Sequence, residues 1–411
     1  MVRELVRKAE ASPATAGRAF LLLFGGFLLL SLASGPVAAG ARQSTPVAHQ
    51  VKASPAAVNA SWDQEDLLES RPAEVAARPE RSFDLPKFPE ASVSGTAGDF
   101  LPGDPTAYPQ RVHGKVFFLS GGSAFSCSGT LVNSRQKNVI YTAGHCVFDR
   151  ETGKFVSKLI FVPGYQNGNT PLGTYAATSL VTTTGWIDNG AFSYDIAAVA
   201  LEDRPEDDLG SRKIAFDLDP GGRSWTIYGY PQEPDPPYTG EQLVGCDAET
   251  ATRDAGTPPT IGASPCSMEQ GASGGGWITD GEYLNSVVSY GYCDTEPDRC
   301  GLIFGPYFSN AAKALYKDPS IGGSADPGVR LKAKPPRKVR KKKVKFRLAG
   351  SGSTPVEFRC KFDRQSYVDC SKKVSVSRLS LGKHVFRARS IDQTDSRSSK
   401  TATWKFRVKK K

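Results

Sequence analysis

The sequence predicts an all-β protein. Beyond residue 111, short runs of Val, Ile, Phe, Tyr and Thr alternate with turns that contain glycine or proline. Residues of the first kind are enriched in strands, and Gly and Pro mark the turns between them. Stretches with the apolar period of a helix are rare. At 411 residues, the chain is long enough for two or three domains with a sizeable core.

The runs that precede residue 290 have the length and composition of strands. They lie at residues 112–119, 128–132, 138–142, 159–163, 191–201, 224–228, 275–279 and 284–289. Many short strands with few helices are typical of a β-barrel or a β-sandwich.

The first 39 residues have the order of segments found in a secretory signal peptide. Basic residues up to Arg18 precede an apolar run at 19–32, and Val37, Ala38 and Ala39 supply the small residues of a cleavage site. We therefore expect cleavage after Ala39 and export to an oxidising compartment. The alternative is an uncleaved membrane anchor, but a run of about 14 residues is short for a span of roughly 20.

Residues 40–104 are rich in Ala, Pro, Ser and charged residues. Such a composition is typical of a propeptide or a flexible leader, and we favour the propeptide. A short helix is expected only at residues 62–68.

The C-terminal part of the chain is strongly basic. Residues 326–411 hold 27 Lys and Arg against 6 Asp and Glu, a balance of +21, which leaves −11 for the first 325 residues and gives the net +10. A concentrated positive field favours anionic partners such as cell-wall polymer or polysaccharide. The alternative is a charged tail without a specific partner. No pattern of a base-reading fold occurs there, so we expect no specific recognition of nucleic acid.

Three separated motifs carry the chemistry. Ser273 lies in the glycine-rich stretch Gln-Gly-Ala-Ser-Gly-Gly-Gly, His145 lies in Thr-Ala-Gly-His-Cys, and Asp195 precedes the apolar run at 196–201. A serine hydroxyl is a poor nucleophile unless a base and an orienting acid accompany it, and the other two motifs supply these groups. The rival acid, Asp188, is more simply read as a surface carboxylate.

These motifs, in the order His, Asp, Ser, resemble those of the chymotrypsin/trypsin-like serine peptidases, and in particular of a secreted bacterial member. The resemblance implies a double β-barrel with the site between the barrels. His145 and Asp195 would come from one barrel and Ser273 from the other. Residues 311–317 would be the remnant of a C-terminal helix. His145 would be the general base, Asp195 would orient its imidazole, and the N–H groups of Gly271 and Ser273 would form the oxyanion hole. Neither a metal nor another cofactor is expected.

The same resemblance implies a disulfide between Cys127 and Cys146. The chain has eight cysteines, which allow 105 pairings. Cys293 with Cys300, and Cys360 with Cys370, would close short loops, which leaves Cys246 with Cys266. A metal site is weakly supported, because the sequence contains no paired Cys or His spacing of the kind that binds zinc.

By position in the family, Ser267 would form the floor of the primary pocket, and Ser289, Tyr290 and Gly291 its substrate-pairing wall. A pocket whose floor has no carboxylate should not select Lys or Arg. Ala272 stands where vertebrate members carry an aspartate that pairs with a freed N-terminal ammonium. The oxyanion loop must therefore be ordered in another way.

Five segments follow from these observations. They are a signal peptide at 1–39, a propeptide or leader at 40–104, a peptidase domain at 105–320, a basic linker at 321–343 and a small β module at 344–411. The module resembles Ig-like β-sandwiches, on the stretches 357–363, 368–370 and 381–389.

The sequence supports a secreted serine endopeptidase, a monomer that acts on proteins or peptides and whose basic module binds anionic surfaces. The alternative is a catalytically inactive surface adhesin or binding protein on a peptidase scaffold.

Overall fold

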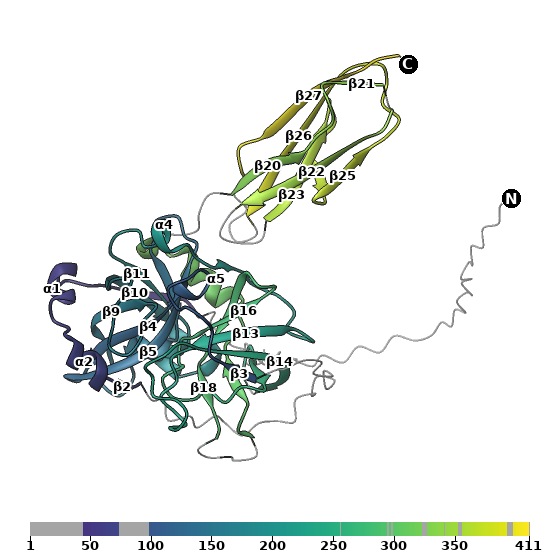
Figure 1. Ribbon diagram of the computed structural model, residues 1–411. Helices are drawn as coiled ribbons and strands as arrows, with labels where there is room; N and C mark the ends of the chain where they lie inside the picture. The colour runs from purple at the N-terminus through teal and green to yellow at the C-terminus, as the bar shows by residue number, and fades with distance from the viewer. Residues whose placement is uncertain are drawn as a thin grey trace, which may run out of the picture. The chain divides into compact units, whose positions relative to one another are not determined.

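The structure is a computed structural model (Figure 1). It describes residues 44–73, 98–254, 256–293, 296, 299–322, 327–340, 342–351, 356–392 and 398–410. The expected signal peptide at 1–39 lies outside these residues. Strands dominate the described part, so the all-β prediction is confirmed. None of the helices in these ranges is long and apolar enough to cross a membrane.

The first sheet closes into a barrel. Its strand order is β1-β10-β11-β6-β5-β4-β9, and β9 also pairs with β10, which joins the last six strands in a ring. The strands are β1 (Pro46–Gln50), β4 (His113–Ser120), β5 (Ser123–Val132), β6 (Val139–Thr142), β9 (Ser157–Pro163), β10 (Tyr175–Thr183) and β11 (Ala197–Leu201).

Apolar side chains fill this barrel. The core includes Val116 of β4, Leu131 of β5, Ile140 of β6 and Val199 of β11, all of them almost completely buried. The residues before β11 do not continue that strand, as the sequence had led us to expect. They form a 3-10 turn, η3 (Phe192–Tyr194), and this turn places Asp195 directly before β11.

The second sheet has the order β12-β17-β16-β13-β14-β15-β19-β18, with β3 paired to β14. Its strands are β3 (Gly98–Phe100), β12 (Lys213–Ile214), β13 (Ser224–Gly229), β14 (Val244–Asp254), β15 (Thr260–Ser264), β16 (Gly276–Thr279), β17 (Tyr283–Val287), β18 (Tyr290–Gly291) and β19 (Ile303–Gly305). Trp225 and Trp277 pack edge to face in its core, with ring centroids 5.6 Å apart.

A third apolar cluster joins the two sheets. It contains Tyr141 of the first sheet, Ile278 and Leu284 of the second, and Leu315 of the helix α5 (Asn310–Lys317). The hydroxyl of Tyr141 donates to the carbonyl of Ala312 in α5 over 2.9 Å. This helix was expected at 311–317, and its apolar face covers the junction.

Residues 44–73 fold against the first barrel. They form β1, which pairs with β10, then α1 (Pro55–Asn59), α2 (Gln64–Glu69) and β2 (Arg71–Pro72), which pairs with β5. Asp63 and Asp66 cap the start of α2 reciprocally, in a capping box. The flexible alternative for the leader therefore does not describe this stretch. β3 also precedes residue 104, yet it belongs to the second sheet.

The C-terminal residues form a β module with its own core. One sheet has the order β20-β22-β25 and the other β21-β27-β26-β23-β24. The strands are β20 (Gly328–Ala333), β21 (Lys338–Val339), β22 (Val344–Ser351), β23 (Val356–Phe362), β24 (Val368–Cys370), β25 (Lys373–Val376), β26 (Gly382–Asp392) and β27 (Ala402–Val408). The rings of Phe346 and Phe386, one from each sheet, stack at 4.0 Å. That the module is Ig-like stays a prediction.

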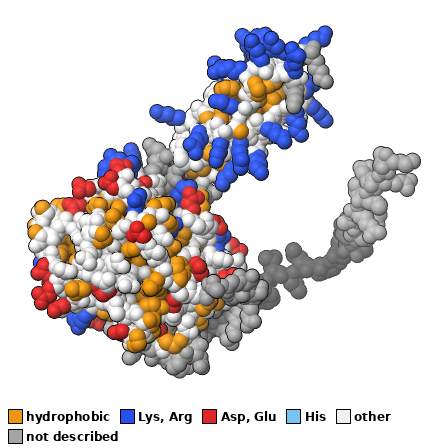
Figure 2. All heavy atoms as spheres, in the orientation of Figure 1, with side chains coloured by type: hydrophobic (Ala, Val, Ile, Leu, Met, Phe, Trp, Pro, Cys, Tyr) orange, Lys and Arg blue, Asp and Glu red, His pale blue; other side chains and the backbone are white. Residues whose placement is uncertain are grey.

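The basic linker expected at 321–343 contains two of these strands. β20 pairs with β22 and β21 pairs with β27, so most of this stretch belongs to the module. On the face that Figure 2 shows, Lys and Arg crowd the module, whereas the remaining described residues visible there show a mixture of charges.

Candidate active site

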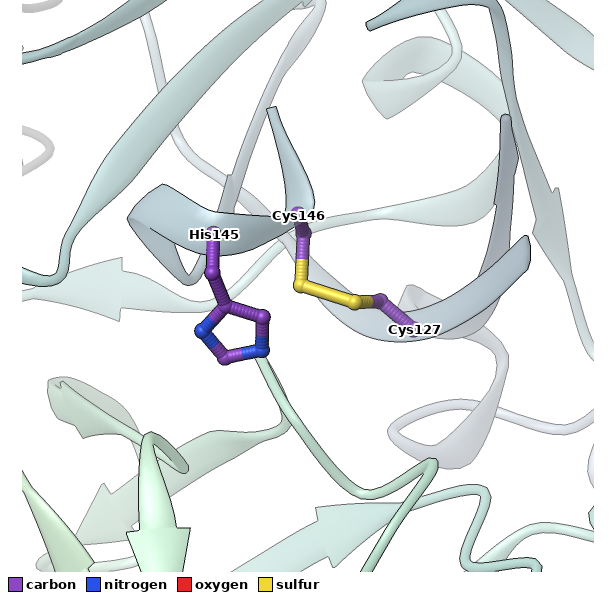
Figure 3. Close-up of side chains that lie close together, drawn as sticks. All are labelled: Cys127, His145 and Cys146. Atoms are coloured by element: carbon purple, nitrogen blue, oxygen red, sulfur yellow. A yellow bond between two sulfur atoms is a disulfide. The ribbon is translucent and has the colours of Figure 1, made fainter. Parts of the chain in front are cut away.

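His145 lies on the 3-10 turn η2 (Gly144–Cys146), directly after β6. The Cys127–Cys146 disulfide links this turn to β5 and lies beside the imidazole (Figure 3). The structure also joins Cys246 with Cys266, Cys293 with Cys300, and Cys360 with Cys370. The two sulfurs beside His145 are bonded to each other, so they are not thiolates that could bind a metal.

Asp195 holds the histidine turn through two hydrogen bonds. Its Oδ1 accepts the backbone N–H of His145 over 2.8 Å, and its Oδ2 lies 2.8 Å from Nδ1 of the ring. Asp195 is fully buried and His145 is 8 % exposed. An ionised carboxylate only accepts, so Nδ1 must carry the hydrogen. Nε2 of His145 then presents its lone pair, and among the described residues this nitrogen has no hydrogen-bond partner.

The turn that carries Ser273 comes from the second sheet and docks on the first. The carbonyl of Ser273 accepts the N–H of Ser128 over 2.7 Å and lies 3.8 Å from Sγ of Cys146. The hydroxyl of Ser128 donates to the carbonyl of Gly271 over 2.9 Å. These contacts bring the serine turn against the strand and the disulfide that flank His145.

Gly274 permits this close approach. Its φ is +82°, and a Cβ built there would lie 2.0 Å from Oγ1 of Thr142 and 2.3 Å from the carbonyl of Ser128. A side chain would thus need both an unfavourable backbone conformation and space that the histidine-bearing strand already fills.

Gly271 also lies where the backbone of the turn closely approaches a neighbouring segment. Its φ is +91°, and a Cβ there would lie 2.6 Å from the carbonyl of Tyr230. The N–H groups of Ala272 and Gly274 donate within the protein. In the described part of the chain, we find no such bond from the N–H of Gly271 or Ser273. Both groups are thus available to an oxyanion, as an oxyanion hole requires.

Comparison with known families agrees with this geometry. The model of the Trypsin family matches residues 103–309, a little more than half of the chain. The chain belongs to the trypsin family. The first and second β-sheets are the double barrel of that fold, and the residues described above lie where these two sheets meet.

Curated relatives of this trypsin-family chain are bacterial. It is 29% identical over 145 residues to a protein of Bacillus subtilis named extracellular metalloprotease, a match that covers 34% of this chain and 45% of the relative. It is 29% identical over 127 residues to a glutamyl endopeptidase of Bacillus licheniformis, which covers 31% of this chain and 38% of the relative. The matches thus span less than half of the length of each relative.

Solved structures show similar matches. Protease Anisep from Arthrobacter nicotinovorans is 33% identical, with a TM-score of 0.46, over 53% of this chain and 97% of that one. The thermostable serine protease AL20 from an extremophilic microorganism is 34% identical, with a TM-score of 0.46, over 52% and 98%.

The residues expected to form the wall of this trypsin-family site differ in their contacts. The hydroxyl of Ser289 donates to Oδ2 of Asp195 over 2.6 Å, so its side chain supports the carboxylate. The ring of Tyr290 packs at 4.4 Å from that of Phe192, and Gly291 is exposed on β18. Asp188, the rival acid, is exposed on α3 (Thr184–Asn189), whereas Asp195 is fully buried.

Ser267, which was expected at the floor of the primary pocket, is exposed, and its polar groups already make hydrogen bonds within the protein. Its hydroxyl and its N–H both donate to the carboxylate of Asp99 in β3. Sequence reasoning missed Asp99, Ser128 and Phe192, because no local motif marks them. Only their positions in the fold bring them to the site.

Proposed function

We propose that this chain is a serine endopeptidase with His145, Asp195 and Ser273 as its catalytic triad. The observation that carries the proposal is the fixed imidazole. Asp195 holds Nδ1, and Nε2 has no hydrogen-bond partner within the described residues. The docking of the Ser273 turn against Ser128 supports the same assignment.

In the first half of the reaction, Nε2 of His145 takes the proton of Ser273 Oγ as that oxygen bonds to the carbonyl carbon of the substrate. The N–H groups of Gly271 and Ser273 stabilise the negative oxygen of the tetrahedral intermediate. The C–N bond then breaks, Nε2 returns the proton to the leaving amine, and an ester remains on Ser273. Water, activated by the same nitrogen, hydrolyses the ester.

Hydrolysis of fluorescent casein by purified variants tests this function. Because triad members act as a unit, Ser273→Ala and His145→Ala should each lower turnover by roughly 10⁴-fold or more while the melting temperature changes little. Ser123→Ala, which alters an exposed serine of β5, is the matched control and should keep full activity. Normal turnover by either triad variant would refute the assignment. A wild-type protein that binds casein without cleaving it would favour the inactive binding protein.

The side chain of the substrate that the primary pocket selects is not assigned by the triad. One curated relative is named a glutamyl endopeptidase. In this chain the Ser267 hydroxyl donates to Asp99, so it is not free to donate to an acidic side chain of the substrate. We therefore propose cleavage of proteins or peptides without assigning the glutamyl preference.

We also propose that the protein is secreted and that the part of its leader before β3 is a propeptide. The disulfides are consistent with an oxidising compartment. The leader contacts the strand that carries Cys127, because the N–H of Ala73 donates to the carbonyl of Ser126 over 2.9 Å. Gln232 Nε2 donates to the carbonyl of Ser70 over 3.1 Å. N-terminal sequencing of the secreted protein should find its first residue after Ala73 and before Asp99. A first residue at position 40 would instead show that the leader is retained.

The basic module supports a second function, attachment to an anionic surface. Its residues 326–411 carry a balance of +21, and they form a domain with its own core. A linear polyanion of the cell wall or an acidic polysaccharide has the complementary charge.

A further inference from the structure

The residues that precede Ser273 need contacts that hold them in place, and the sequence motifs of the trypsin family do not show which residues provide these contacts. Ala272, beside the nucleophile, is fully buried in an apolar cluster with Trp277 and Cys266. It has no charge to anchor the turn. The residues before it must therefore be held through other contacts if the N–H groups of Gly271 and Ser273 are to stay aligned.

Asp99 supplies such contacts. Its Oδ2 accepts the N–H of Ser267 over 3.1 Å, and its Oδ1 lies 3.3 Å from the same nitrogen. The hydroxyl of Ser267 also donates to Oδ2. The hydroxyl of Tyr238 donates to Oδ2 over 2.6 Å. One carboxylate thus binds two segments, which lie 139 and 168 residues from Asp99 in the sequence. Hydrogen bonds to a charged acceptor are stronger than neutral ones.

The strand that carries Asp99 is itself fixed. In β3, Asp99 lies opposite Cys246 of β14, and Cys246 is joined by a disulfide to Cys266, the residue before Ser267. The ring of Phe100 covers Gly245 of β14, where a Cβ would lie 2.4 Å from the ring. The carboxylate therefore projects from a held backbone.

The two segments that Asp99 joins both frame the oxyanion turn. Gln232 N–H donates to the carbonyl of Gln270 over 2.7 Å, and Glu269 N–H donates to the carbonyl of Glu233 over 3.1 Å. Tyr238 belongs to the same loop as Gln232, and its N–H donates to the carbonyl of Pro234 over 3.0 Å. Burial and the hydrogen bond to Asp99 raise the pKa of Tyr238 to about 12, so its hydroxyl remains a donor at neutral pH.

We propose that Asp99 is a positioning residue, which aligns the oxyanion turn by holding Ser267 and Tyr238. This inference rests on the proposed peptidase function. Ala272 has no charge with which to order the oxyanion turn. In this proposal, Asp99 in the N-terminal segment of the domain orders the turn instead. Asp99 touches neither the substrate nor the reacting atoms in this account. It acts through the backbone of residues 267–271.

The test uses Asp99→Ala and Asp99→Asn in the full-length protein. Asp104→Ala is the matched control, because Asp104 lies in the same segment and, among the described residues, its carboxylate accepts hydrogen bonds from Thr106 alone, within its own turn. We expect Asp99→Ala to lower kcat and the rate of labelling of Ser273 by a phosphonate about 10- to 100-fold, with KM changed less than about threefold. Asp99→Asn, which keeps an acceptor, should lose less. If the two residues act through one contact, the double variant with Asp99→Ala and Ser267→Ala should have a kcat no lower than that of the less active single variant.

Hydrogen exchange of the peptide that contains residues 265–273 provides a readout independent of activity. Exchange there should become about tenfold faster in Asp99→Ala and stay unchanged in Asp104→Ala, while the rest of the domain keeps its protection. Unchanged kcat and exchange in Asp99→Ala would overturn the inference. A uniform loss of protection across the domain would also overturn it, by showing a purely structural role. If the wild type is not labelled, the peptidase proposal fails, and exchange alone still decides the role of Asp99.

Discussion

The hydroxyl of Ser289 donates a 2.6 Å hydrogen bond to Oδ2 of Asp195, the oxygen that also faces Nδ1 of His145. A buried carboxylate needs such donors, because burial without them disfavours its charge. Ser289 lies between β17 and β18 of the second barrel, and it thus connects this barrel to the hydrogen-bonded pair Asp195 and His145 of the first. It stabilises the ionised aspartate in the orientation that fixes the imidazole.

Removal of this donor should weaken the triad without abolishing it. Ser289→Ala leaves the bond between Asp195 and His145 in place, so we expect kcat to fall about 10-fold, far less than the roughly 10⁴-fold loss expected for Asp195→Asn. Steady-state kinetics on a peptide substrate would check this order. A Ser289→Ala variant as impaired as Asp195→Asn would show that the hydroxyl does more than support the carboxylate.

Gly274→Ala should be far more damaging than Gly281→Ala. Both glycines have a positive φ, but a Cβ at Gly274 meets Thr142 at 2.0 Å, whereas a Cβ at Gly281 meets no atom within 4 Å. The shared backbone cost is about 1–2 kcal/mol. Only Gly274→Ala should also displace the serine turn and lower kcat at least about 100-fold. Thermal unfolding and kinetics of both variants measure the two effects. Equal activities would contradict the close packing of the two barrels at this glycine.

His113 should make the free energy of unfolding fall in acid. It is buried on β4, with Nδ1 3.0 Å from Oγ1 of Thr130 and Nε2 accepting from Arg212 over 3.2 Å. Burial, and then the charge of Arg212, hold its pKa well below 6.5. The unfolded chain therefore binds one more proton below about pH 6.5, and this lowers stability by up to about 1.4 kcal/mol per pH unit.

Denaturant unfolding of the wild type and of His113→Gln, measured between pH 7.5 and 5, checks this effect. Below about pH 6.5, the stability of the variant should fall less steeply than that of the wild type. Identical slopes would show that His113 is protonated equally easily in the folded and unfolded chains, against the contacts described here.

The basic module should bind anionic polymer in a salt-dependent manner. Exposed charges are screened over about 10 Å at 0.1 M salt, so retention on an anionic wall polymer should fall steeply between low and high salt. Truncation of residues 326–411 should remove this retention and leave hydrolysis of a small peptide unchanged. Equal retention of full-length and truncated protein would rule out attachment through the module.

Much of the candidate site could be predicted, because its reactive residues lie in short sequence motifs. His145 beside Cys146, Asp195 before an apolar run and Ser273 among glycines each have a recognisable neighbourhood. The Cys127–Cys146 disulfide that the family resemblance implied is present in the structure. The strands β4, β6, β9 and β13 lie close to their expected positions, because Val, Ile and aromatic residues dominate them.

The remaining features depend on contacts between distant residues. β14 is rich in Asp, Glu and Ala, which are depleted in strands, so pairing with its neighbours rather than composition determines it. Asp99 lies in a stretch whose composition indicated a leader, and its partner Ser267 is 168 residues away. Residues 191–196 are apolar enough for a strand, but they form the turn η3 that orients Asp195.

The most direct measurement of the central claim is the site at which a serine-directed phosphonate reacts. The account predicts one adduct, found by mass spectrometry on the peptide that contains Ser273, and its formation should slow by orders of magnitude in His145→Ala. An adduct on a different serine would contradict the triad. No adduct on a folded wild-type protein would also contradict it, and would favour a binding protein on a peptidase scaffold.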